Sequence, residues 1–151
     1  MKDPLIKLCG YVLHRAAAGA LADLNRRLAP LGLRHAGVAM LMLVEARPGI
    51  TQSQAGRMLD IQRANMVPFV ARLERLGVIR RRQVDGRSQA LELTGRGHML
   101  LERARRVVNA HEARLLARVP AELRPMVLPV LKALWQRDPD SAASRDRRSE
   151  P

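Results

Sequence analysis

Apolar side chains recur every three or four residues over most of this 151-residue chain, which is the spacing of helices that bury one face. The first such stretch covers residues 4–29, which span about 38 Å as a helix, more than a small core alone can bury. Pro30 and Gly32 end this helix. Because it is longer than a small core can cover, we expect part of this first helix to pack on another subunit. A second, largely apolar helix is predicted at residues 35–46.

Two shorter helices are predicted next, separated by a break at Asp60. Thr51 followed three residues later by Gln54 is a capping-box pattern, so a short helix begins there and runs to about residue 59. The next helix, at residues 62–76, keeps its apolar residues at helical spacing. It contains Pro68, which we expect to lie in the first turns, where proline is tolerated.

The periodicity then changes to that of strands. Residues 78–82 and 89–93 are β-prone and lie on either side of an Asp-Gly turn signal, which predicts a β-hairpin. After the hairpin, a long helix is predicted at residues 95–118 and a last helix at residues 121–136. The predicted fold is mainly α (α+β): a winged helix-turn-helix with a two-stranded wing between long terminal helices. The expected regions are a dimerisation region at 1–34 and 95–136, a DNA-binding domain at 35–94 and a disordered tail at 137–151.

The charge points to a polyanionic partner. The chain carries a net charge of +13, and residues 57–106, with 12 basic and 5 acidic side chains, hold +7 of it. This concentration suits a phosphate backbone. No apolar run reaches the roughly 20 residues that span a bilayer, and the start of the chain lacks the features of a secretory signal. We therefore expect a soluble, cytoplasmic protein that needs no membrane.

Side chains for catalysis or metal binding are not grouped in the sequence. One cysteine excludes an intramolecular disulfide and a cysteine-rich metal site. The four histidines are scattered, and no glycine-rich phosphate loop is present. We expect neither an enzyme nor a cofactor. The alternative is a sequence-independent architectural DNA- or RNA-binding protein, but such proteins more often carry aromatic residues that stack on bases, and this chain has three aromatic residues in all.

Three motifs follow one another after the predicted helix-turn-helix. Together they resemble the MarR family of bacterial transcriptional regulators, whose pattern is LE-x-x-G-h-h-x-R, D-x-R-[SA] and L-x-L-T-x-x-G, with h apolar. The resemblance covers about residues 8–135. One departure is Arg34, where the family usually has Thr or Ser, so we expect a weak N-cap on the helix at 35–46. The motifs are Leu73-Glu74 with Gly77 to Arg81, then Asp85-Gly86-Arg87-Ser88, then Leu91 to Gly97.

The resemblance implies that the helix at 62–76 enters the DNA major groove. The residues agree, since Arg pairs with guanine and Asn or Gln with adenine, and all three types occur in its first turn. Arg87 at the hairpin tip suits a narrow minor groove, and Asp85 is expected to orient it. The alternative is that these are ordinary solvated side chains. The predicted DNA-binding residues are Gln52, Ser53, Gln54, Gln62, Arg63, Asn65, Met66, Arg72, Arg82, Asp85, Arg87 and Ser88.

The resemblance also implies a homodimer on a pseudo-palindromic operator of double-stranded DNA, most often as a repressor, released by a small effector of the aromatic acid or acyl-CoA type. An Arg with two His residues suits a carboxylate or phenolate, although such residues are more often structural. The predicted effector-binding residues are Tyr11, His14, Arg15, Arg34, His35 and Met40. The candidate interface residues, with core packing as the alternative, are Val130, Leu131, Leu134 and Trp135.

Cys9 lies near the position of the peroxide-sensing cysteine of one branch of the family. That branch pairs the cysteine with tyrosines on the helix that corresponds to residues 35–46, and this chain has none there. We expect a buried, inert thiol.

Overall fold

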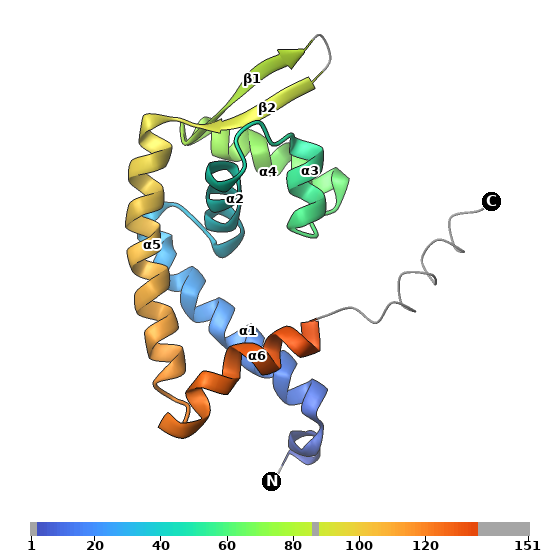
Figure 1. The fold of residues 1–151 in the computed structure, drawn as a ribbon, viewed down its shortest axis with the longest axis vertical. Helices are drawn as coiled ribbons and strands as arrows, with labels where there is room; N and C mark the ends of the chain where they lie inside the picture. Colours follow the sequence, from blue (N-terminus) through green and yellow to red (C-terminus); the bar gives the residue numbers. More distant parts are fainter. Residues whose placement is uncertain (1–2, 86–87, 136–151) are drawn as a thin grey trace, which may run out of the picture. The chain divides into compact units, whose positions relative to one another are not determined.

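The computed structural model describes residues 3–85 and 88–135, and the chain divides at His111 into two compact units. The order of elements confirms the predicted winged helix-turn-helix (Figure 1). The predicted tail at 137–151 lies outside the described residues. The elements are η1 (Pro4–Lys7), α1 (Cys9–Leu28), η2 (Ala29–Leu31), α2 (His35–Ala46), α3 (Gln52–Met58), α4 (Arg63–Arg75), β1 (Ile79–Asp85), β2 (Ser88–Leu93), α5 (Gly95–Leu116), η3 (Ala121–Leu123) and α6 (Arg124–Trp135).

The single helix predicted at residues 4–29 is wrong at its start. Asp3 caps a one-turn 3-10 helix, Leu8 is extended at φ −91° and ψ 113°, and α1 begins only at Cys9. A 3-10 turn has about three residues and an α turn 3.6, so apolar spacing over four residues cannot tell them apart. The predicted end is confirmed, because Gly32 takes a left-handed φ of 70° after η2.

The second helix has the predicted bounds. Arg34 is its N-cap residue and makes no side-chain capping bond, as expected for this departure from the family pattern. Asn25 of α1 supplies the cap instead, since its Oδ1 accepts a hydrogen bond from the backbone N–H of His35 at 2.8 Å. The corner between α1 and α2 is therefore fixed by a side chain from the preceding helix.

The two helices of the helix-turn-helix begin and end where their signals stand. The capping box at Thr51 and Gln54 is present, and Asp60 turns the chain at a φ of 52°. Pro68 is the sixth residue of α4, in its second turn, where its missing N–H leaves the carbonyl of Ala64 without a helical donor. It is exposed, so water can satisfy the carbonyl group that loses its helical donor.

The hairpin is longer than predicted and is fixed to the helices at its base. Its two strands are antiparallel, with a bulge between Gln83 and Asp85. Leu91 N–H donates to the carbonyl of Ile50 at 2.8 Å, which attaches β2 to the segment before α3. The hydroxyl of Thr94, which also caps α5, donates to the carbonyl of Gly77 at 2.6 Å. We call the two strands and their connection the wing.

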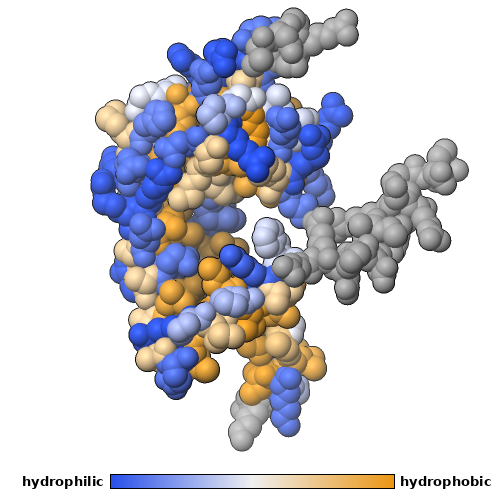
Figure 2. Space-filling view, viewed as in Figure 1, coloured by the Kyte–Doolittle hydropathy of each residue, from blue (hydrophilic) through white to orange (hydrophobic). Residues whose placement is uncertain are grey.

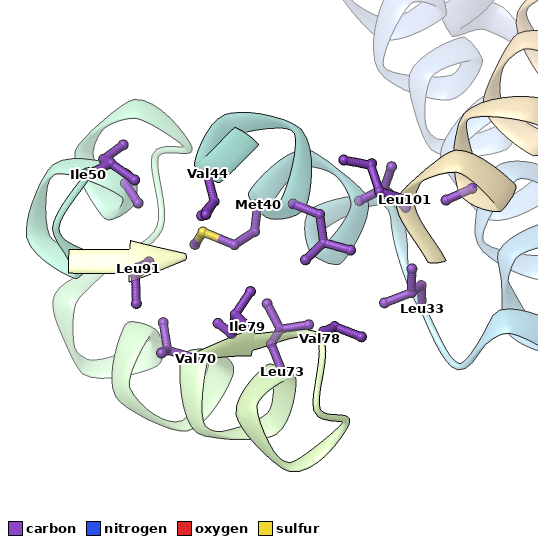
Figure 3. Packing of buried hydrophobic residues seen from close by; sticks show 14 of the residues in the cluster. Leu33, Met40, Val44, Ile50, Val70, Leu73, Val78, Ile79, Leu91 and Leu101 are labelled. Atoms are coloured by element: carbon purple, nitrogen blue, oxygen red, sulfur yellow. The ribbon is translucent and has the colours of Figure 1, made fainter. Parts of the chain in front are cut away.

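The core lies among α2, α3, α4, the base of the wing and the first half of α5, with Leu28 added from the end of α1 (Figure 3). In the other unit, residues 112–151, no side chain of α6 is buried. Among the described residues no single helix is long and apolar enough to cross a membrane; α1 with η2 and α2 pass that test only together, bent by 73°. The fully buried side chains of the core include Leu28, Met40, Leu41, Val70, Leu73, Val78, Leu91 and Leu101.

Candidate nucleic-acid interface

The first turn of α4 presents three of the predicted base-reading residues to solvent. Gln62, Arg63 and Asn65 are exposed. Met66, which we also predicted to bind DNA, is 2% exposed and belongs to the core, so that prediction is wrong. Its side chain packs on α3, where a Cβ on Gly56 would lie 2.9 Å from Met66 Cγ. Met66 therefore sets the approach of α4 to α3 and offers no surface to a base.

The start of α3 offers two of its three predicted residues freely. The side chain of Gln54 is engaged in the capping box: its Oε1 accepts from the backbone N–H of Thr51 at 2.9 Å. Ser53 is exposed and Gln52 is half-buried at the first turn. Free N–H groups at such a helix start suit a phosphate oxygen.

One carboxylate holds two arginines of the wing. Glu92 of β2 lies opposite Arg80 and accepts from both Arg80 and Arg82 of β1. The hydrogen bond from Arg82, with a further one from Arg80, holds the pKa of Glu92 below its ordinary value. Arg82, a predicted DNA-binding residue, thus has its Nε occupied by Glu92, while its side chain stays 55% exposed.

The tip of the wing is only partly described. The backbones of Asp85 and Ser88 are paired at the outer end of the strands. Arg87 lies outside the described residues. The predicted role of Asp85 in orienting Arg87 therefore stays a prediction.

A cavity at the corner between α1 and α2 brings together residues that we had assigned to different sites. It measures about 470 Å³ and includes Arg34, predicted for the effector, and Arg72 of α4, predicted for DNA. Arg72 donates to the carbonyl of Gly32 at 3.4 Å. Arg26 and Asn25 also line it, and sequence reasoning missed both. Arg26 is paired with Asp23, so the guanidinium groups of Arg34 and Arg72 are the two that suit an anionic group.

Of the other predicted effector residues, His35 lies next to this cavity, because its backbone N–H and its Nδ1 lie 2.8 Å and 3.2 Å from Oδ1 of Asn25, whereas the remaining four lie away from it. Tyr11 precedes Asn25 by fourteen residues, about 21 Å along α1, and its hydroxyl donates to Asp3 at 2.9 Å. His14 and Arg15 are exposed on the same part of α1. Met40 is fully buried in the core. Within one chain, the predicted effector set is therefore not a single site.

A second basic cavity lies beside α3 and was not predicted. It measures about 500 Å³ and is lined by Arg47 and Arg57 together with Gln54 and Met58. The only sequence signal was that Arg47 precedes the predicted short helix and Arg57 lies in its last turn.

The described residues contain no group of three or more acidic, His or Cys side chains that could hold a metal ion. Cys9 is exposed in the single chain, so the expectation that it is buried is wrong. It begins α1, whose buried residues comprise Leu28 alone, because the first turns of that helix pack on no other part of the core.

Comparison with known proteins finds similar transcriptional repressors, two of which are described below, although no protein-family model matches. The HTH-type transcriptional repressor Rv2887 of Mycobacterium tuberculosis is 33% identical over 114 residues, 74% of this chain and 82% of Rv2887. The transcriptional repressor CouR bound to a 23-mer DNA duplex is 32% identical, with a TM-score of 0.84, over 90% of this chain and 99% of CouR.

Both relatives have also been solved with small molecules. CouR bound to p-coumaroyl-CoA is 31% identical, with a TM-score of 0.83, over 91% of this chain and 99% of CouR. Rv2887, a MarR family protein, has been solved in complex with salicylic acid; it is 30% identical, with a TM-score of 0.69, over 88% of this chain and 97% of Rv2887. Both relatives are transcriptional repressors, which supports a regulator rather than an enzyme.

Proposed function

Because this chain belongs to the MarR family of transcriptional regulators, we propose that it is a repressor that binds a pseudo-palindromic operator as a homodimer and releases it on binding a small effector. The observation that carries the proposal is the exposed first turn of α4, with Gln62, Arg63 and Asn65 beside an arginine-rich wing. Since an operator is chromosomal DNA, the proposed place of action is the cytoplasm.

A gel shift with the DNA upstream of the protein's own gene tests operator binding. At moderate salt we expect a preference for this DNA over unrelated duplex of equal length. Arg63→Ala and Asn65→Ala should each weaken operator binding about tenfold, since a bidentate base contact is worth roughly 1–3 kcal/mol. Arg106→Ala, on the exposed surface of α5, removes the same charge and serves as the control.

The same experiment separates the proposal from the alternative of sequence-independent binding. An architectural protein would bind both duplexes equally, and Arg63→Ala would then lower both affinities by no more than Arg106→Ala does. That pattern would overturn the proposed function.

We propose that the homodimer forms through the ends of the chain, residues 1–34 and 95–136, and that residues 35–94 bind DNA. Figure 2 shows hydrophobic side chains exposed over the N-terminal part of α1, whereas the wing is largely hydrophilic. Leu5, Leu8 and Val12 are 43%, 56% and 45% exposed. Trp135 of α6 is 83% exposed. Light scattering after size exclusion should give twice the mass of one chain.

We propose that the effector is an aromatic acid or its CoA thioester, the ligand classes of the two relatives. The cavity at Arg34 and Arg72 would take its anionic group. The predicted residues of α1, Tyr11, His14 and Arg15, would join the site only if the second copy in the dimer brings them there. The guanidinium groups of Arg34 and Arg72 lie outside the ion pairs found among the described residues.

A thermal-shift screen with salicylic acid, p-coumaroyl-CoA, p-coumaric acid and CoA tests this assignment. A true effector should both stabilise the protein and dissociate it from operator DNA. Arg34→Ala should reduce the stabilisation, whereas Arg106→Ala should leave it unchanged. A stabiliser whose effect survives Arg34→Ala would place the effector elsewhere.

A further inference from the structure

Arg81 of the wing lies on the face of β1 that covers the core. Side chains alternate along a strand, so Ile79 and Arg81 share one face and Arg80 and Arg82 share the other. Ile79 is 2% exposed, and Leu91, which pairs with Arg81 across the hairpin, is 1% exposed. Arg81 is therefore at the outer margin of the apolar contact between the wing and the helices.

From this position Arg81 reaches α4, the recognition helix that the proposed function places in the major groove. Its Nε lies 3.3 Å from Oε1 of Glu74, in the last turn of α4. The two side chains are 34% and 32% exposed, so the contact is neither buried nor fully solvated. It joins the two elements that the proposed function assigns to DNA.

Backbone hydrogen bonds fix the base and one edge of the wing. Val78 N–H donates to Leu73 at 3.2 Å, and Thr94 N–H donates to Val78 at 3.1 Å. Leu91 N–H donates to Ile50 at 2.8 Å along the β2 edge. These bonds hold the wing at its base and along β2. The tilt of β1 toward α4 therefore depends on side-chain contacts, those of the buried Ile79 and of Arg81 with Glu74.

A small tilt at this line has a large effect farther out. Six residues separate Ile79 from Asp85, about 20 Å of strand, so a tilt of about 10° moves the outer end by about 3.5 Å. A shift of this size would break a hydrogen bond made to DNA from the outer end of the wing, since donor and acceptor must lie within about 2.7–3.2 Å of each other. Arg80 and Arg82 cannot prevent it, since both bind Glu92 within the same hairpin.

We propose that Glu74 and Arg81 are positioning residues, which set the angle of the wing on the recognition helix and so the preference for the operator. The inference rests on the proposed function, in which α4 meets the major groove and the wing the minor groove. Partly exposed ion pairs contribute little to stability, so the role of the pair is geometric.

The test uses the full chain with Glu74→Gln, Arg81→Gln and the charge exchange Glu74→Arg with Arg81→Glu. We expect each single substitution to lower the ratio of operator affinity to unrelated-DNA affinity by about two- to fivefold, the range that such an ion pair can carry. Protection of the minor groove from hydroxyl radicals should be lost, while methylation protection of guanine N7 in the major groove remains. The charge exchange should restore both, and the melting temperature should shift by no more than about 4 °C.

Glu102→Gln is the matched control, because it makes the same change in net charge at a side chain of α5 that is 60% exposed. It should raise the affinity for both DNAs alike. If Glu74→Gln behaves like Glu102→Gln and keeps the minor-groove protection, the inference is overturned while the proposed function stands. A wild-type protein without any operator preference overturns both.

Discussion

Two regions of the molecule use similar apolar residues in opposite ways. One is the lobe from α2 to the first half of α5, which carries the wing; the other is the ends of the chain, α1 and α6. Between α2 and the first half of α5, large apolar side chains such as Leu41 and Leu101 are fully buried. By contrast, α1 buries only Leu28, and α6 buries none. The exposed side chains there include Leu131 at 43% and Leu134 at 57%.

This difference shows which part of the fold one chain completes by itself. The lobe has its apolar contacts satisfied within the chain, so its geometry, and with it the DNA-binding surface, is set by local packing. Exposed apolar patches of this extent on the ends are the mark of a surface that another molecule covers. Substitutions should therefore act on the lobe at any protein concentration and on the ends only through assembly.

The largest effect is expected where the wing meets α5. A Cβ on Gly97 would lie 2.0 Å from the carbonyl oxygen of Val78, and backbone atoms cannot move aside as a side chain can. Gly97→Ala should lower the free energy of unfolding by about 4 kcal/mol or more. Gly95→Ala, with nothing within 4 Å, should change it by less than about 1 kcal/mol. Urea unfolding followed by circular dichroism measures both, and equal stabilities would contradict the close packing.

The core of the lobe should respond next. Leu41 is 0% exposed, so Leu41→Ala should cost about 3 kcal/mol of unfolding free energy through lost burial and a cavity. The matched control is Val67→Ala on α4, which is 57% exposed and should stay within about 0.5 kcal/mol of wild type. The loss at Leu41 should be the same at every protein concentration. A loss that shrinks as concentration rises would mean that the lobe depends on assembly.

Local signals in the sequence predicted most elements of the lobe. The bounds of α2, the capping box at Thr51 and Gln54, and the left-handed Gly77 after α4 all depend on residues a few positions apart. The apolar spacing also contained the correction for Met66, since Met66, Val70 and Leu73 follow the i, i+4, i+7 rule of one buried face.

Contacts between distant segments could not be predicted in this way. Counting back from the Asp85–Ser88 pair places Glu92 opposite Arg81, but the bulge between Gln83 and Asp85 moves it opposite Arg80. The meeting of Arg34 with Arg72 likewise depends on how α1, α2 and α4 pack. The fold was thus readable from local pattern, whereas the partners of the charged side chains were not.

The ends should respond through assembly alone. Leu131→Asp puts a carboxylate on the exposed apolar surface of α6, and it should raise the dissociation constant of the dimer by about tenfold or more, because an unpaired charge in an interface is costly. Lys132→Gln makes the same unit change in charge on the same helix without removing an apolar side chain. Sedimentation over a range of concentrations measures both. An unchanged dimer would move the interface away from α6.

The smallest effect concerns the contact that ties α1 to α5. Asp23 Oδ2 lies 2.7 Å from Nε of Arg27 and 3.2 Å from Nδ1 of His111, which is 4% exposed. Hydrogen bonds from Arg27 and then Arg26 hold the pKa of Asp23 well below its ordinary value. The unfolded chain therefore binds a proton at a pH where the folded chain does not. The stability from this carboxylate is present above pH of about 4 and is lost as the pH falls further.

Thermal unfolding between pH 6 and pH 3 tests that sign. The wild-type melting temperature should fall more steeply below about pH 4 than that of Asp23→Asn, which lacks the titrating group. Glu122→Gln on η3 removes the same charge and should keep the wild-type slope. Equal slopes for wild type and Asp23→Asn would show that the contact between α1 and α5 does not depend on the charge of this carboxylate.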